Sequence, residues 1–196
     1  RRVLNELLER TTTEAARHGG YVDKYVGDEA MIAFGAPLVT PAQEQALAAA
    51  ELSLEIYRIA AELDLSVGVG INTGAMSLGC FTPRSRPSYT AMGDAVNRAA
   101  FLEGWTRVTG GRPAVTAHVR DLISPTYRAV FALEAVPRRR PGSIDIFTIV
   151  GRRDALSPPE VDFWDQYDHA VTLVSDGRPG EALAPLECGL LLAEIV

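Results

Sequence analysis

One carboxylate lies where a tight turn separates two apolar segments. Asp28 follows Gly27 and precedes Glu29, and the flanking segments 21–26 and 30–34 are rich in residues that favour strands. Gly and Asp are common in hairpin turns for backbone reasons alone. An aspartate at the tip of a rigid hairpin is also a good ligand for Mg²⁺, because the strands fix its position. Both interpretations of Asp28 remain open at this point.

A metal ion would need a second oxygen ligand beside Asp28. The local candidates are Asp23 and Glu29. Strand alternation predicts that Asp23 points to the side opposite Lys24, and Glu29 belongs to the turn itself, so neither is convincing. Lys24 is the only lysine among the 19 basic residues. The presence of this single lysine is either chance or the sign of a position that needs a compact ammonium group.

A further polar constellation lies in segment 89–97. Thr90 or Asp94 could cap the helix that follows. Asn97 then falls in the first turns of that helix, with Phe101 one turn later on the same face. An amide in an alanine-rich stretch needs hydrogen-bond partners, and a ligand could supply them.

Three glycines, Gly68, Gly70 and Gly74, suggest a dinucleotide-binding loop at first sight. That motif requires a strand that leads directly into a helix whose N-terminus faces the pyrophosphate. Here the glycines lie within and after a strand, and another strand follows. We therefore interpret them as sites of close backbone packing or of a bulge.

The elements that must position these residues alternate between helices and strands. The patterns predict helices over 3–18, 41–63, 94–105 and 118–123. They predict strands over 21–26, 30–34, 65–71, 74–81, around Val115, and over 129–136 and 144–150. The strand 74–81 is expected to form a hairpin with 65–71, and residues 82–88 are expected to form a loop. This order predicts an α+β fold in which helices cover a mainly antiparallel sheet.

A separate, acidic tail is expected after this region. Residues 151–160 suggest a linker, and 161–196 suggests two helices, 161–175 and 179–194. One helical pair resembles the start of a tetratricopeptide array, which would bind a protein partner, but it is equally compatible with a helical hairpin packed on the main domain. Residues 155–196 contain 1 basic and 8 acidic residues (net −7), against 18 basic and 17 acidic (net +1) before them.

Composition excludes several classes of protein. The net charge of −6 gives no nucleic-acid footprint, and no run approaches the ~18 apolar residues of a membrane span. Cys80 and Cys188 cannot form a disulfide framework or a four-cysteine metal site. The start at Arg1, without Met or an apolar signal core, is typical of a fragment. We expect this part of the protein to be cytoplasmic and without membrane contact, and a membrane anchor upstream in the parent protein stays open.

Three segments in order, 19–28, 67–74 and 89–97, resemble the class III adenylate/guanylate cyclase catalytic domain. The resemblance covers residues 1 to about 150. It implies a ferredoxin-like α+β domain that works as a head-to-tail homodimer or cyclase-domain heterodimer, with active sites between the chains. It also implies two Mg²⁺ or Mn²⁺ ions on a pair of aspartates, one of which matches Asp28.

The same resemblance assigns roles to three further residues. Lys24 matches the lysine that recognises the purine, and Thr90 matches its partner in the ATP-selective bacterial type. Asn97 matches the asparagine that orients the ribose or the α-phosphate. The implied reaction is conversion of ATP to 3′,5′-cyclic AMP and pyrophosphate in signal transduction.

Two departures from the family pattern matter. The first metal aspartate of the family would lie upstream of Arg1, and Phe101 occupies the position of an arginine that donates to the transition state. Arg98 lies about 100° away around the helix and cannot simply substitute. Loss of such a donor typically costs ~10²–10³-fold in rate. The alternative to an adenylate cyclase is therefore a catalytically impaired regulatory or dimerisation module.

Overall fold

The computed structural model describes residues 2–36, 38–81, 89–137 and 142–187. The helices are α1 (Arg2–Arg17), α2 (Ala42–Glu62), α3 (Asp94–Glu103), α4 (Ala117–Ile123) and α5 (Pro158–Ser175), followed by a 3-10 turn, η1 (Pro179–Glu181). The strands are β1 (Tyr21–Val26), β2 (Glu29–Ala33), β3 (Gly70–Ile71), β4 (Ser77–Cys80), β5 (Tyr89–Met92), β6 (Ala114–Thr116), β7 (Tyr127–Ala135) and β8 (Ile144–Arg152). None of the described helices is long and apolar enough to cross a membrane.

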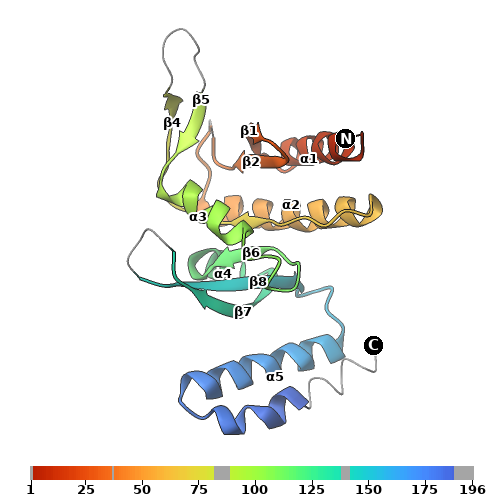
Figure 1. Ribbon diagram of the computed structural model, residues 1–196, viewed down its shortest axis with the longest axis vertical. Coiled ribbons are helices and arrows are strands. Elements are labelled where there is room, and N and C mark those ends of the chain that lie inside the picture. The colour runs from red at the N-terminus through yellow and green to blue at the C-terminus, as the bar shows by residue number, and fades with distance from the viewer. Residues whose placement is uncertain (1, 37, 82–88, 138–141, 188–196) are drawn as a thin grey trace.

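The strands form three groups, shown in Figure 1. β1 pairs with β2 and β4 with β5, while the central sheet has the order β3-β6-β8-β7. Every pairing is antiparallel except the short parallel contact of β3 with β6. The predicted α+β fold with a mainly antiparallel sheet is confirmed.

Two apolar clusters hold the central sheet between helices. The first contains residues of α2, α4 and the sheet: Ala46, Ala50, Val115, Val119, Ile123, Tyr127, Phe147 and Ile149. The second lies under α3 and consists of Leu102, Ala114, Ala135 and Ile146. Ala114 and Val115 are neighbours in β6 and belong to different clusters. Because successive strand residues point to opposite faces, α2 and α4 cover one face of the sheet and α3 packs on the other.

A polar contact fixes α2 on this sheet. The hydroxyl of the buried Tyr127 donates to the Glu51 carboxylate, which also accepts from Arg152 at 3.2 Å. Burial, and next the Glu51 carboxylate, raise the pKa of Tyr127 to about 12. The phenol therefore remains a neutral donor at neutral pH.

The second predicted hairpin was wrong. Of segment 65–71, only Gly70–Ile71 enters a ladder, and its partner is β6. β4 pairs with β5 instead, as Figure 1 shows for the hairpin that projects from the body. Strand pairing depends on the tertiary partner more than on local alternation, so the alternating residues 65–69 did not suffice to form a strand. The predicted loop 82–88 lies outside the described residues.

The C-terminal elements pack directly on the domain. β8 extends to Arg152 and α5 begins at Pro158, so residues 153–157 connect them where a linker over 151–160 was predicted. A capping box closes the start of α5: Ser157 N and Oγ lie 2.8 and 2.7 Å from Glu160 Oε2. Beyond η1, residues 183–187 are helical, and the rest of the predicted helix 179–194 lies outside the described residues.

Side chains of α5 reach the outer strand β7. The Tyr167 hydroxyl donates to Phe131 O at 2.7 Å. Arg128 Nη2 donates to Trp164 O at 3.1 Å and pairs with the carboxylates of Asp165 and Asp168. The helical hairpin is thus joined to the sheet, and whether it begins a repeat array stays a prediction.

Candidate active site

The first strand of the candidate site contains a β-bulge. Val22 is paired with Ile32 and Lys24 with Met31, so Asp23 has no partner in β2. A bulge breaks the alternation of side chains along a strand. The predicted opposite orientation of Asp23 and Lys24 was therefore wrong: Asp23 Oδ2 lies 3.6 Å from Lys24 Nζ.

Lys24 and Thr90 are brought together from distant parts of the sequence. The Lys24 ammonium donates to Thr90 Oγ1 at 2.7 Å, and the lysine side chain is 43% exposed. Thr90 lies within β5 and is only 7% exposed. It is not the helix cap that the sequence suggested. Gly93 is the N-cap residue of α3, so neither Thr90 nor Asp94 occupies the cap position.

A buried carboxylate underlies this pair. The Asp23 side chain has an exposed fraction of 0%. It accepts from Thr90 Oγ1 at 2.6 Å and from the backbone N–H of Ala91 at 3.2 Å. Sequence analysis considered Asp23 only as a metal ligand and missed this role. The available signal was the charged pair Asp23 and Lys24 within a strand of aromatic and aliphatic residues, since a buried charge needs partners.

The helix that contains Asn97 is anchored by a residue that sequence analysis also missed. Asn72, just after β3, donates from Nδ2 to Ala95 O at 3.0 Å and accepts from Thr116 Oγ1 at 3.1 Å. These contacts fix the first turn of α3. Asn97 is exposed in that turn, and its backbone N–H donates to Gly93 O at 3.3 Å. The Asn97 amide is thus free of the core and accessible from solvent.

One turn further along α3, Phe101 faces its apolar surroundings. Its ring packs edge-on against Trp105, with centroids 6.2 Å apart, and it contacts the cluster around Leu102. A partly buried phenyl ring cannot donate a hydrogen bond to a phosphate. The structure thus gives Phe101 a packing role at the position where the resemblance implied an arginine.

Close backbone contact explains one of the glycines. A Cβ atom on Gly70 would lie 2.2 Å from Ala99 O and 2.4 Å from Glu103 N, both in the backbone of α3. Only glycine allows β3 and α3 to approach so closely. The interpretation as a packing glycine is confirmed for Gly70.

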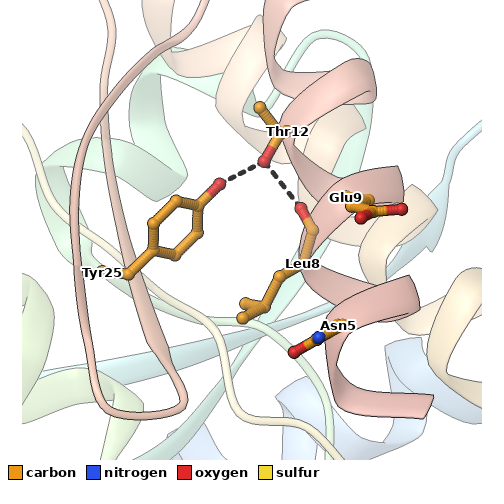
Figure 2. Close-up of a pocket in the computed structure, with 5 residues that line it drawn as sticks. All are labelled: Asn5, Leu8, Glu9, Thr12 and Tyr25. Atoms are coloured by element: carbon orange, nitrogen blue, oxygen red, sulfur yellow. Dashed lines mark hydrogen bonds between the residues drawn. The ribbon is translucent and has the colours of Figure 1, made fainter. Parts of the chain in front are cut away.

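A small surface cavity of about 200 Å³ lies between β1 and α1 (Figure 2). Its lining residues are Asn5, Leu8, Glu9, Thr12 and Tyr25. Thr12 Oγ1 donates to Leu8 O at 2.6 Å and is also hydrogen-bonded to the Tyr25 hydroxyl. These contacts tie the β1–β2 hairpin to α1, and they involve none of the sequence-predicted site residues.

Residues 1–138 match the family model described as the adenylate and guanylate cyclase catalytic domain. The chain belongs to this family. The cyclase domain is 33% identical over 134 residues to an uncharacterized protein of Mycobacterium tuberculosis, covering 67% of this chain and 24% of the relative. It is 29% identical over 170 residues to adenylate cyclase 1 of Rhizobium meliloti, and this match covers 81% of this chain and 25% of the relative. The chain therefore spans about a quarter of the length of these curated relatives.

A solved structure supports the same assignment. The cyclase domain resembles the crystal structure of the adenylyl cyclase CyaB from P. aeruginosa with a TM-score of 0.72 and 26% identity. The match covers 79% of this chain and 84% of that chain. The resemblance stated from sequence is therefore confirmed for the family and the fold.

The cyclase family typically uses divalent metal ions, and Asp28 is the local candidate ligand. Asp28 is exposed in the turn after Gly27, whose φ is +67°. Glu29 is also exposed and opens β2. Across the described ranges, no group of three or more histidine, cysteine or acidic residues is placed to hold a metal ion. The described residues therefore do not form a metal site by themselves.

Proposed function

We propose that this cyclase domain recognises ATP and, within the full-length protein, converts it to 3′,5′-cyclic AMP and pyrophosphate. The contact of Lys24 Nζ with Thr90 Oγ1 at 2.7 Å supports the choice of ATP. An ammonium can donate to adenine N1, which is an acceptor, whereas guanine N1–H would face a second donor. The burial of Thr90 keeps its hydroxyl in a fixed position beside the exposed ammonium.

The reaction would proceed by attack of the ribose 3′-oxygen on the α-phosphorus, with pyrophosphate leaving. Asn97 would orient the ribose or the α-phosphate, and its exposed position on α3 is compatible with contact to a ligand. Asp28 would supply one carboxylate to a Mg²⁺ or Mn²⁺ ion.

The active assembly we propose is a homodimer or a heterodimer with another cyclase domain. Asp28 and Asn97 are both exposed, so both could contact a nucleotide that is bound between this chain and a second chain. Such a protein would work in the cytoplasm, where ATP is available. A protein partner could bind the helical tail.

The test is formation of cyclic nucleotide from ATP and from GTP by the full-length protein with Mn²⁺. We expect cyclic AMP to be the main product. Asn97→Ala should abolish turnover while ATP binding persists, and Asn5→Ala, at an exposed asparagine on α1, serves as a matched control. Preference for GTP, or equal activity of Asn97→Ala and wild type, would contradict the proposal.

A second candidate function is a cyclase-like dimerisation or regulatory module with little activity. The observation that favours it is the packing of Phe101 on Trp105, which replaces a charged donor. This module would dimerise and would bind nucleotide poorly or not at all. The same assay, run beside calorimetric ATP binding, distinguishes the two candidates.

A further inference from the structure

The direction of one hydrogen bond in the candidate site is fixed by chemistry. An ionised carboxylate only accepts hydrogen bonds, and a threonine hydroxyl has a single proton to donate. Thr90 Oγ1 lies 2.6 Å from Asp23 Oδ2, so its proton points to Asp23. Thr90 Oγ1 is then an acceptor toward every other neighbour, and it does accept from Lys24 Nζ at 2.7 Å.

From this geometry we infer that Asp23 is a positioning residue that determines purine preference through Thr90. The inference rests on the proposed function, because it assumes that Lys24 and Thr90 face the base. A hydroxyl held as an acceptor has a lone pair for the 6-amino group of adenine. It has no proton for the 6-oxo group of guanine.

The position of Asp23 in the fold holds the Thr90 hydroxyl in one orientation. The carboxylate has no exposed surface and holds Ala91 N–H at 3.2 Å with its second oxygen. β1 and β5 belong to different two-stranded sheets, so these side-chain bonds connect them where no ladder does among the described strands. The bulge at Asp23 is the feature that turns its side chain toward Thr90.

Asp23 therefore also contributes to structure, and the test must separate the two effects. Removing the side chain would leave the buried Ala91 N–H without an acceptor, which destabilises the fold whatever the role in recognition. Asp23→Asn keeps the shape and one acceptor oxygen. Its amide N–H₂ can donate to Thr90 Oγ1, which frees the threonine proton and reverses the polarity of the hydroxyl.

The experiment measures binding of three nucleotides to the full-length protein by calorimetry. The probes are ATP, GTP and purine ribonucleoside triphosphate, which has hydrogen in place of the 6-amino group. Wild type should prefer ATP over the purine analogue by roughly 10-fold, the size of one hydrogen bond lost at a fixed acceptor. Asp23→Asn should reduce that preference to within about threefold and should improve GTP binding relative to ATP.

A double-mutant cycle gives the readout that a purely structural role would not change. Thr90→Val removes the hydroxyl, so Asp23→Asn should cause no further change of preference in the Thr90→Val background. If Asp23→Asn fails to fold, the pair Thr90→Ser and Thr90→Val still tests whether the purine preference depends on the threonine hydroxyl. Serine keeps the hydroxyl and should keep the preference, and valine should lose it.

The outcomes distinguish the inference from the function it rests on. A folded Asp23→Asn variant with the wild-type ratio of ATP to purine-analogue affinity would overturn the inference alone. Equal ratios in Thr90→Ser and Thr90→Val would do the same. A wild-type protein that binds neither ATP nor GTP would overturn the proposed function, and the inference with it.

Discussion

Lys24 and Thr90 are 66 residues apart in the sequence, yet the ammonium of one donates to the hydroxyl of the other at 2.7 Å. The two residues lie in strands of separate two-stranded sheets. Their contact therefore depends on side chains and on the buried Asp23 carboxylate beneath them. A lysine that is 43% exposed, next to a hydroxyl that is buried, leaves one side of the pair open to a ligand.

We expect Lys24→Ala to weaken ATP binding by about 10-fold, because it removes a charged donor to the base. It should also lower the free energy of unfolding, because it leaves the buried Asp23 carboxylate, 3.6 Å from Lys24 Nζ, without this cation. Calorimetry on the full-length protein gives the first quantity and thermal unfolding the second. Arg17→Ala, an exposed cation on α1 paired with Glu14, is the control and should affect neither. Equal ATP affinity in Lys24→Ala and wild type would remove Lys24 from the site.

Changing both members of the pair should change the base that is preferred. In Lys24→Glu with Thr90→Cys, the glutamate can accept from guanine N1–H and N2–H, so the affinity ratio should shift toward GTP. We expect a partial shift, because surrounding packing also shapes the pocket. The measurement compares ATP and GTP binding in the double variant and in both single variants. A double variant that binds both nucleotides with the wild-type ratio would contradict the pairing.

Phe101 provides a test of catalytic impairment. In the full-length protein, Phe101→Arg should raise cyclic AMP formation at least 10-fold, because it restores a donor one turn from Asn97. It should also destabilise the fold by about 1–3 kcal/mol, through loss of the ring contact with Trp105 and of partial burial. Phe101→Leu keeps an apolar side chain without a donor and should give no gain in rate. An unchanged rate in a folded, dimeric Phe101→Arg protein would count against this account.

Gly70 tests how closely α3 must approach the sheet. A methyl group there would meet Ala99 O at 2.2 Å and Glu103 N at 2.4 Å, so Gly70→Ala must displace backbone. We expect a loss of about 1–3 kcal/mol or more in the free energy of unfolding. Because α3 contains Asn97, turnover of the folded fraction should fall as well. The control is Gly104→Ala, whose nearest atom would lie at an ordinary 3.6 Å, and it should be well tolerated.

The sequence predicted best where local patterns determine the structure. The strand 21–26 was predicted with its observed bounds, and the long helix 41–63 differs from α2 by one residue at each end. Turn residues such as Gly27 and regular apolar spacing are local signals. The family resemblance likewise depends on short motifs that are visible without the fold.

Features that depend on long-range pairing were not predictable in this way. Segment 65–71 alternates like a strand, but only Gly70–Ile71 pairs, and its partner is the distant strand β6 (Gly70 with Ala114) and not β4, which forms a hairpin with β5. The bulge at Asp23 reverses the expected direction of its side chain, and no residue type in the strand predicts a bulge at this position. Thr90 within a strand and Thr90 as a helix cap look alike in the sequence, because both precede a helix. Their difference lies in the buried partner, Asp23.

Arg128 is the residue whose removal should release the C-terminal helix. Its side chain is only 16% exposed and joins β7 to α5 through Asp165 Oδ1 at 2.9 Å, Asp168 and Trp164 O. Arg128→Ala leaves the Trp164 carbonyl and the partly exposed carboxylates of Asp165 and Asp168 without this donor, so we expect a loss of about 1–3 kcal/mol in the free energy of unfolding.

Hydrogen exchange should show the same loss locally. Backbone amides of α5 should exchange at least 10-fold faster in Arg128→Ala, while those of α2 remain protected. Arg178→Ala is the matched control: its pair with Glu181 is more than half exposed on both sides, and such exposed pairs contribute little to stability. If Arg128→Ala and Arg178→Ala behave alike, the ion pairs of Arg128 do not hold α5. The apolar contacts and the bond from Tyr167 to Phe131 O would then account for its position on the sheet.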